Sequence, residues 1–321
     1  IFSEPLSQYE EILKDAIHTS MKESGTKLAK TFQNLLIEIL TLYMILPRKI
    51  NFTQMARYGK HGEQTYRQNF NRKKQDCIDW LLLNLSLARR VLDMDGLLAI
   101  AIDPCYISKA GKKTPHIGRF WSGCAGAVKH GLEIMGIGLL DVANNKCMML
   151  RAHQTLGNSV LKMRNKTLVD YYISVMKLYS KKLLSITDIV VADAFFSTST
   201  FEKGMSEFGF YLVSRFRDNA CLHYIPKKEK GRGRPRVKGN KIDMANLNLS
   251  CMEELHIDGL EGKAYTLKAY AKALKKNGHR GNSRRIPPAP LSLASCKEPV
   301  ADFVIYKTTQ DDGNVCLLLV L

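Results

Sequence analysis

The chain contains 321 residues, of which 45% are hydrophobic and 24% are charged, as is typical of a globular protein with one large domain or a few smaller ones. Its 48 lysines and arginines outnumber its 30 aspartates and glutamates, which gives a formal net charge of +18. An excess of this size indicates a polyanionic partner, of which nucleic acid is the commonest and a membrane surface the alternative. No apolar run reaches the roughly 18 residues of a membrane-spanning helix, and the eight cysteines include no CxxC pair, so we expect reduced thiols in a cytosolic protein and no zinc cluster.

Residues 1–93 are predicted to be helical, because aliphatic side chains recur there at spacings of three and four. The clearest stretches are residues 12–17, 28–46 and 78–92. No alternation of the kind expected for strands interrupts them.

A helix-turn-helix is predicted within residues 50–75. A short helix over 52–58 is followed by a turn with Gly59 and Gly62 and by a second helix over 63–72. One polar face of the second helix would present donors and acceptors to base edges, and the basic residues after it would lie near phosphates. The predicted DNA contacts are Gln64, Arg67, Gln68, Asn71, Arg72 and Lys73. The alternative is a solvated helix in a helical bundle.

From Leu97 the periodicity changes to that of strands alternating with helices, which predicts a mixed α/β sheet with flanking helices. The order is strand, strand, strand, helix, strand, helix, strand, which is also the order of the ribonuclease H-like fold. The predicted strands cover 97–103, 129–142, 146–156, 188–193 and 210–216, with a turn at Asn144–Asn145, and the helices cover 159–182 and 197–208.

Two aspartates each end a buried apolar run in this order. Asp103 closes LLAIAID, and Asp193 closes DIVVAD. An acid at the end of such a strand is held on a rigid element and faces a cleft, as a metal-binding carboxylate requires. The alternative for Asp103 is an ordinary turn-starting aspartate before Pro104.

Residues 217–321 are basic and rich in short alternating runs, which predicts a β-rich region. The segment PKKEKGRGRPRVKGN, residues 226–240, contains an Arg-Gly-Arg-Pro core that resembles the AT-hook, whose arginines enter a narrow minor groove. The expected contacts are Arg232, Arg234 and Arg236, and the alternative is a solvated basic loop. Residues 262–297 contain no acid and would bind phosphates without sequence preference. The alternating runs are 241–249, 254–259, 264–271, 302–308 and 315–321.

Several of these pieces resemble the DDE-type transposases of bacterial insertion sequences, whose ribonuclease H-like core is interrupted by a β-rich insertion after the fifth strand. The matching segments are AIDPCYISKAGKKT around Asp103, VVADAFFSTSTF around Asp193, FEKGMSEFGFYLVSRFR and GRGRPRVKG. The resemblance covers about residues 50–321. It implies a helical DNA-binding domain over 1–93, a catalytic core over 94–216 and an insertion over 217–321.

The resemblance also implies a chemistry. In the family three carboxylates bind two Mg²⁺ or Mn²⁺ ions, and a water or a DNA 3′-hydroxyl attacks a phosphodiester. The first and fourth strands lie side by side there, and Asp103 and Asp193 match the first two carboxylates. We expect Lys109, Lys112, Lys113 and Arg119 to approach the DNA backbone.

The third carboxylate, a glutamate on a helix after the insertion, has no match in these residues. We expect it beyond Leu321, because Glu253, Glu254 and Glu261 lie inside the insertion. A chain without it would bind DNA and cleave it poorly.

The expected partners are double-stranded DNA, as transposon ends and target, and a second copy of the chain when it is assembled on DNA. The expected location is the bacterial cytoplasm, at the nucleoid. Two alternatives stay open: an inactive, truncated DNA-binding derivative that inhibits active copies, and a structure-selective nuclease on the same fold. A membrane role is the weakest option, because the basic stretches are rich in glycine and proline.

Overall fold

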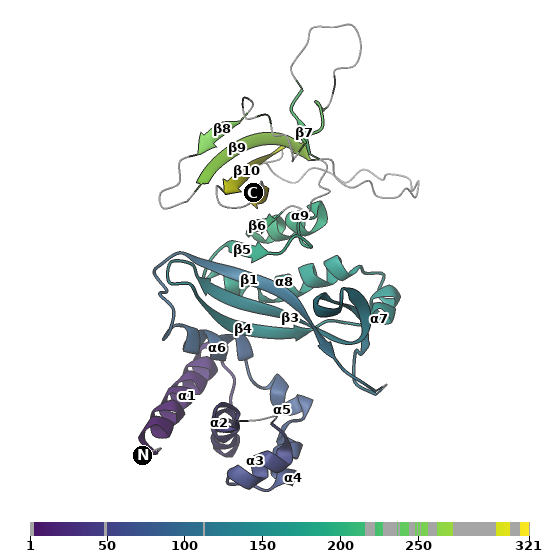
Figure 1. Cartoon of the computed structure of the whole chain (residues 1–321). Helices are drawn as coiled ribbons and strands as arrows, with labels where there is room; N and C mark the ends of the chain where they lie inside the picture. Colours follow the sequence, from purple (N-terminus) through teal and green to yellow (C-terminus); the bar gives the residue numbers. More distant parts are fainter. Residues whose placement is uncertain are drawn as a thin grey trace. The chain divides into compact units, whose positions relative to one another are not determined.

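The computed structural model describes residues 3–47, 50–111, 113–215, 222–226, 236, 238–243, 248, 250, 252–255, 262–271, 300–308 and 315–320. They belong to two compact units (Figure 1). The first comprises Ile1–Ala99 and Ile134–Gln154, and the second comprises Ile100–Glu133 and Thr155–Leu321. Within the described ranges no helix is both long and apolar enough to cross a membrane.

The first unit is mainly helical, as the spacing of aliphatic residues predicts. Buried side chains such as Leu13, Leu36 and Leu83 join its helices in one core. The helices are α1 Ser3–Ser24, α2 Lys30–Ile45, α3 Phe52–Tyr58, α4 Glu63–Asn69, α5 Arg72–Asp76 and α6 Trp80–Ala88.

The helix-turn-helix outline is present, with one correction. Helix α3 has the predicted bounds, because the Asn51 side chain caps it by accepting a hydrogen bond from the Gln54 N–H at 2.8 Å. The predicted second helix over 63–72 is wrong in its length, since α4 ends at Asn69 and α5 begins at Arg72. The side chain of Asn71 accepts a hydrogen bond from the Lys74 N–H at 3.0 Å, so this residue starts a new helix and does not continue the old one.

A β-hairpin completes the first unit. The second half of β3 (Ala127–Asp141) pairs with β4 (Lys146–Gln154) in antiparallel fashion. The predicted turn at Asn144–Asn145 is confirmed, and Asn145 adopts a left-handed φ of 51° that asparagine tolerates well. The Asp141 carboxylate accepts hydrogen bonds from the N–H groups of Asn144 and Asp93, which fixes the turn.

The second unit contains a mixed sheet flanked by helices, so this coarse prediction of the fold class is confirmed (Figure 1). Its strands follow the order β2-β3-β1-β5-β6-β11-β10-β9-β7, with β8 paired to β9. Strands β1, β5 and β6 run parallel, and the other described pairings are antiparallel. The bounds are β1 Leu98–Ser108, β2 Gly118–Ser122, β5 Ile189–Ala192, β6 Tyr211–Arg215, β7 Leu222–Tyr224, β8 Glu253–Leu255, β9 Gly262–Ala271, β10 Val300–Thr308 and β11 Val315–Val320.

The helices of this unit are α7 Asn158–Met163, α8 Leu168–Leu184 and α9 Ser199–Phe208, with a short 3₁₀ turn, η1, at Gly123–Ala125. Helix α9 packs against α8 and β6. The predicted single helix over 159–182 is wrong, because Thr167 and Asp170 form a capping box that starts α8 separately from α7.

Strand β1 is longer than predicted. It continues through Pro104 to Ser108, whereas the sequence analysis ended it at Asp103. The pairing of β1 with β5 stops at Ile102 opposite Ala192, so the strand beyond this point is an edge on the β5 side. A proline lacks the N–H that a ladder needs, and an edge tolerates it. Strand β2 was not predicted at all.

The capping box gives a stability prediction. Replacing Thr167 with alanine removes the hydroxyl that accepts the Asp170 N–H at 3.1 Å, and we expect unfolding to become easier by about 1 kcal/mol in urea titrations. Thr167→Ser keeps the hydroxyl and should match the parent protein. Equal losses in both variants would contradict the capping role.

Candidate active site

The structure places Asp103 and Asp193 at adjoining positions of two neighbouring strands. In the parallel pairing of β1 with β5, Ile102 lies opposite Ala192, and the next residue of each segment is one of the two aspartates. Neighbouring strands lie about 4.8 Å apart, so both residues reach the same edge of the β1–β5 ladder. Both are exposed, and solvent or a ligand can reach them.

Burial and the charge of Asp193 both act on the ionisation of Asp103. The pKa of Asp103 is raised above its ordinary value, first because burial disfavours the charged form and second because the charge of Asp193 repels it. Two like charges at this spacing attract a divalent cation, whose own charge would remove the repulsion. The pair therefore has the electrostatic character of a cation site.

Asp193 is held by its own loop. Its carboxylate accepts a hydrogen bond from the Phe195 N–H at 3.1 Å, and its carbonyl oxygen accepts one from the Ser214 hydroxyl of β6 at 2.8 Å. The second bond joins the loop to β6, the strand next to β5. The loop after β5 is thus fixed at both its side chain and its backbone.

An aromatic cluster joins this loop to helices α8 and α9. Phe196 contacts Phe195, Phe201 of α9 and Tyr172 of α8, with ring centroids 5.2, 4.7 and 5.4 Å apart. The side chains of Phe196, Phe201 and Tyr172 are fully buried. The two phenylalanines of ADAFFS therefore anchor the segment that carries Asp193 to the helices behind the sheet.

A buried acid that the sequence analysis missed supports the same cluster. The Tyr172 hydroxyl donates a hydrogen bond to the Glu133 carboxylate of β3 at 2.5 Å, and burial together with this bond raises the pKa of Tyr172 far above its ordinary value. Glu133 is an isolated acid in the run KHGLEIMGIGLL, and the sequence of that run does not indicate its hydrogen-bond partner. Its role in linking β3 to α8 follows from the tertiary structure alone.

The chemistry of the donors fits a hard cation. Carboxylate oxygens are the ligands that Mg²⁺ and Mn²⁺ prefer, and the pair supplies two side chains of this kind. Among the residues that the structure describes, no cluster of three or more His, Cys, Asp or Glu side chains could hold a metal ion. The described part of the site is therefore a pair of acids.

The residues predicted to read DNA lie on the surface of the first unit. Gln64 and Gln68 are exposed on α4, and Lys73 is exposed on α5. Arg67 pairs with Glu63 and its guanidinium lies 5.0 Å from the Phe52 ring centroid, while Asn71 caps α5. The side chain of Arg72 lies outside the described residues.

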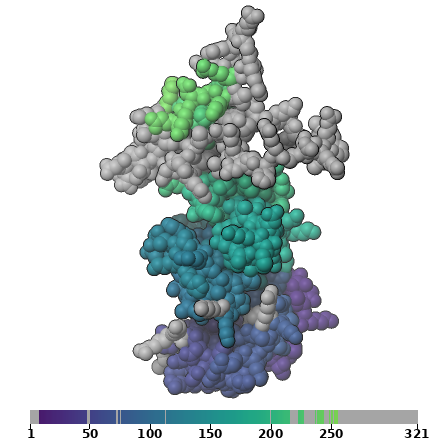
Figure 2. Space-filling model, turned by 90° about the vertical axis from the view of Figure 1, so that its right-hand side faces the viewer, coloured from purple at the N-terminus to yellow at the C-terminus, as the bar shows by residue number. Residues whose placement is uncertain are grey.

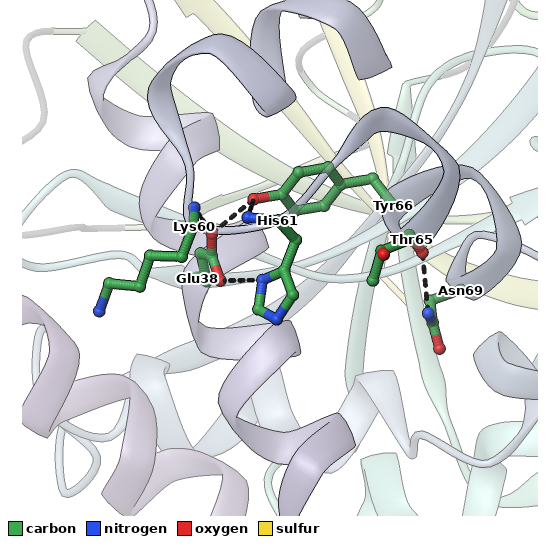
Figure 3. A network of polar contacts seen from close by, with 6 residues as sticks. All are labelled: Glu38, Lys60, His61, Thr65, Tyr66 and Asn69. Atoms are coloured by element: carbon green, nitrogen blue, oxygen red, sulfur yellow. Dashed lines mark hydrogen bonds and ion pairs between the residues drawn. The ribbon is translucent and has the colours of Figure 1, made fainter.

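The turn between α3 and α4 is fixed by one partly buried acid, Glu38 (Figure 3). The Glu38 carboxylate of α2 accepts hydrogen bonds from the Tyr66 hydroxyl at 2.5 Å, the Lys60 N–H at 2.5 Å and the His61 ring at 2.8 Å. Gly59 is required here, because a Cβ atom would lie 2.0 Å from the Tyr66 hydroxyl. Burial raises the pKa of Glu38, but the hydrogen bonds outweigh it and lower the pKa overall.

The other predicted DNA contacts belong to the second unit. Lys109, Lys113, Arg119 and Arg236 are exposed. Lys112, Arg232 and Arg234 lie outside the described residues, as does most of the predicted AT-hook segment.

Comparisons with known proteins identify no family for the chain. No model of a protein family matches the chain, and no curated protein matches it.

Glu38 gives a prediction with a defined pH dependence. Its pKa is lowered in the fold, so its stabilisation is complete above the ordinary value of 4.5 and is lost as the pH falls through the lowered value. We expect Glu38→Gln to reduce the free energy of unfolding by about 1–3 kcal/mol at pH 7, with the difference shrinking below pH 4.5. Urea titrations across pH measure this. Glu11→Gln, at an exposed position of α1, is the control, and an equal loss there would contradict the assignment.

The carboxylate pair gives a second prediction. Replacing Asp193 with asparagine removes the neighbouring charge, so the pKa of Asp103 should fall toward its ordinary value of 3.8. Carbon-13 NMR titration of the aspartate carboxyls measures this. Asp188→Asn, at the opposite end of the segment that contains β5, should leave Asp103 unchanged. An Asp103 titration that ignores both substitutions would contradict the proximity of the pair.

Proposed function

We propose that the chain is a DNA transposase of the DDE type, in which Asp103 and Asp193 hold divalent metal for phosphodiester cleavage and strand transfer. The observation that carries the proposal is the carboxylate pair at the adjoining positions after Ile102 and Ala192. The raised pKa of Asp103 supports it, because perturbed carboxyls of this kind are concentrated at functional sites.

The sheet supports a ribonuclease H-like core for this function. Strands β1 and β5 match the first and fourth predicted strands, and they are parallel neighbours. Strand β6, the fifth predicted strand, is the next parallel neighbour. This arrangement agrees with the resemblance noted from the sequence.

The role proposed for the two aspartates is that of metal ligands. The carboxylates of Asp103 and Asp193 would supply oxygen ligands from a rigid strand end and a fixed loop. Two Mg²⁺ or Mn²⁺ ions held there would supply activation of the attacking oxygen and stabilisation of the leaving oxygen. The third carboxylate of the proposed site is a glutamate outside the described pair.

Binding to double-stranded DNA is the second part of the proposal. The net charge of +18 and the exposed polar faces of α4 and α5 support it. Assembly of two copies on DNA and a location at the bacterial nucleoid belong to the same proposal.

Cleavage assays test the catalytic role. The protein is incubated with DNA that contains the sequences flanking its own gene, with Mg²⁺ or with chelator. We expect metal-dependent nicking at the ends, reduced roughly a thousandfold by Asp103→Asn and by Asp193→Asn, while binding of the ends is kept. Asp188→Asn is the matched control and should cleave normally.

The assay has two contradicting outcomes. Unchanged cleavage in both pair variants would remove Asp103 and Asp193 from the reaction. Cleavage of branched or hybrid substrates without regard to end sequence would assign a structure-selective nuclease instead.

A further inference from the structure

One exposed face of the second unit has no role in the site described so far. It comprises Arg119 and Trp121 of β2 and Val128 and His130 of β3, and we call it the β2–β3 face. The antiparallel pairing sets Arg119 opposite His130 and Trp121 opposite Val128. Directly paired residues point to the same side of a sheet, so these four side chains share one face.

The opposite side of the same strands is packed. Phe120 and Ser122 are buried between the exposed residues of β2, as strand alternation requires. Tyr106 of β1 lies on that packed side, where it would meet a Cβ atom at Gly131.

The indole of Trp121 is open to solvent. Its exposed fraction is 60%, and Val128 beside it is 51% exposed. Figure 2 shows side chains of the blue segment, which includes β2 and the start of β3, at the molecular surface. A large flat aromatic ring beside basic groups is a surface on which a nucleic-acid base can stack.

The charge of this segment is complementary to a polyanion. Residues 104–132 contain five lysines and arginines and no aspartate or glutamate. Within the described part of this run, Lys109, Lys113, Arg119 and Lys129 are exposed. The acid-free run begins directly after Asp103 and ends directly before Glu133.

The strands hold the face in a fixed position. The Tyr106 hydroxyl donates a hydrogen bond to the His130 carbonyl oxygen at 2.7 Å, which links β1 to β3 below the exposed residues. Gly131 permits this, because a Cβ atom there would lie 2.4 Å from the Ile107 carbonyl oxygen. Side chains on such paired strands are positioned before a ligand arrives.

We propose that the β2–β3 face binds an unpaired segment of DNA, with a base stacked on Trp121 and a flanking phosphate contacted by Arg119. The bases of an intact duplex present edges in the grooves, whereas an exposed indole needs the free face of a base. This inference rests on the proposed function and deepens it, because strands opened near a cleaved end supply such bases.

Tryptophan fluorescence tests the proposal directly. The chain has two tryptophans, Trp80 and Trp121, so a Trp80→Phe variant reports on Trp121 alone. We expect a single-stranded thymidine oligonucleotide of about twelve nucleotides to quench its emission without metal, and a blunt duplex of equal length to quench it far less. A Trp121→Phe variant, which keeps Trp80, should show no such quenching.

Affinity supplies the second readout. We expect Trp121→Ala to weaken single-strand binding roughly tenfold, whereas Tyr9→Ala, at an exposed aromatic of the first unit, should bind normally. Arg119→Gln should reduce the slope of log affinity against log salt by about 0.7, the value for one phosphate contact to a single strand.

Several outcomes would overturn the inference. These are equal quenching by duplex and single strand, unchanged affinity in Trp121→Ala, or quenching by vesicles of anionic lipid and not by DNA. The binding experiments contain no metal, so a loss of cleavage in the Asp103 and Asp193 variants does not change their outcome. Failure of the cleavage assay and failure of this inference are therefore distinguishable.

Discussion

The candidate site depends on the register of one parallel strand pair. Ile100 lies opposite Val190 and Ile102 opposite Ala192, so the acids that follow arrive at the same level of the sheet. Ile100 and Val190 are completely buried, which fixes this register through packing as well as through hydrogen bonds. A slip of one residue would turn one carboxylate to the opposite face. The chemistry assigned to the pair therefore rests on an apolar ladder that contains no functional group.

The surroundings of the pair compensate for its unfavourable electrostatics. Partial burial of Asp103 and, second, the like charge of Asp193 disfavour its ionised form in the fold, as the raised pKa of Asp103 indicates. The buried aromatic rings around Phe196 and the hydrogen bond from Tyr172 to Glu133 act in the opposite direction and hold the loop of Asp193 in place. The unfavourable electrostatic interaction is confined to the candidate site, and functional sites are where folded proteins depart from optimal stability. Glu38 in the first unit differs, because its hydrogen bonds lower its pKa and favour the folded state.

Periodicity and capping residues predicted much of the fold, and the failures have physical causes. Helix α3 has the predicted bounds because Asn51 and Gly59 flank it, whereas α8 begins later than predicted because the Thr167 capping box separates it from α7. The predicted first strand ends at Asp103, before Pro104, whereas β1 continues to Ser108. The sequence does not show that the neighbouring strand stops at this point and leaves an edge that tolerates the proline. Strand β2 is a five-residue hairpin arm, GRFWS, too short for a periodic signal. For the site, the ends of two apolar runs in the sequence indicate Asp103 and Asp193 as candidate residues. The contact between Glu133 and Tyr172 is not visible in the sequence, because it forms only through tertiary packing.

The distance along the chain between the two aspartates has a consequence for how the protein is made. Asp193 follows Asp103 by ninety positions, and the pair forms only after β5 has docked beside β1. Contacts of such long sequence separation are slow to form, because the loop between them must close first. During synthesis from the N-terminus, the helices of the first unit and the hairpin of β3 and β4 emerge before β5. A chain still on the ribosome can thus fold its helical segments well before it has a functional pair of acids.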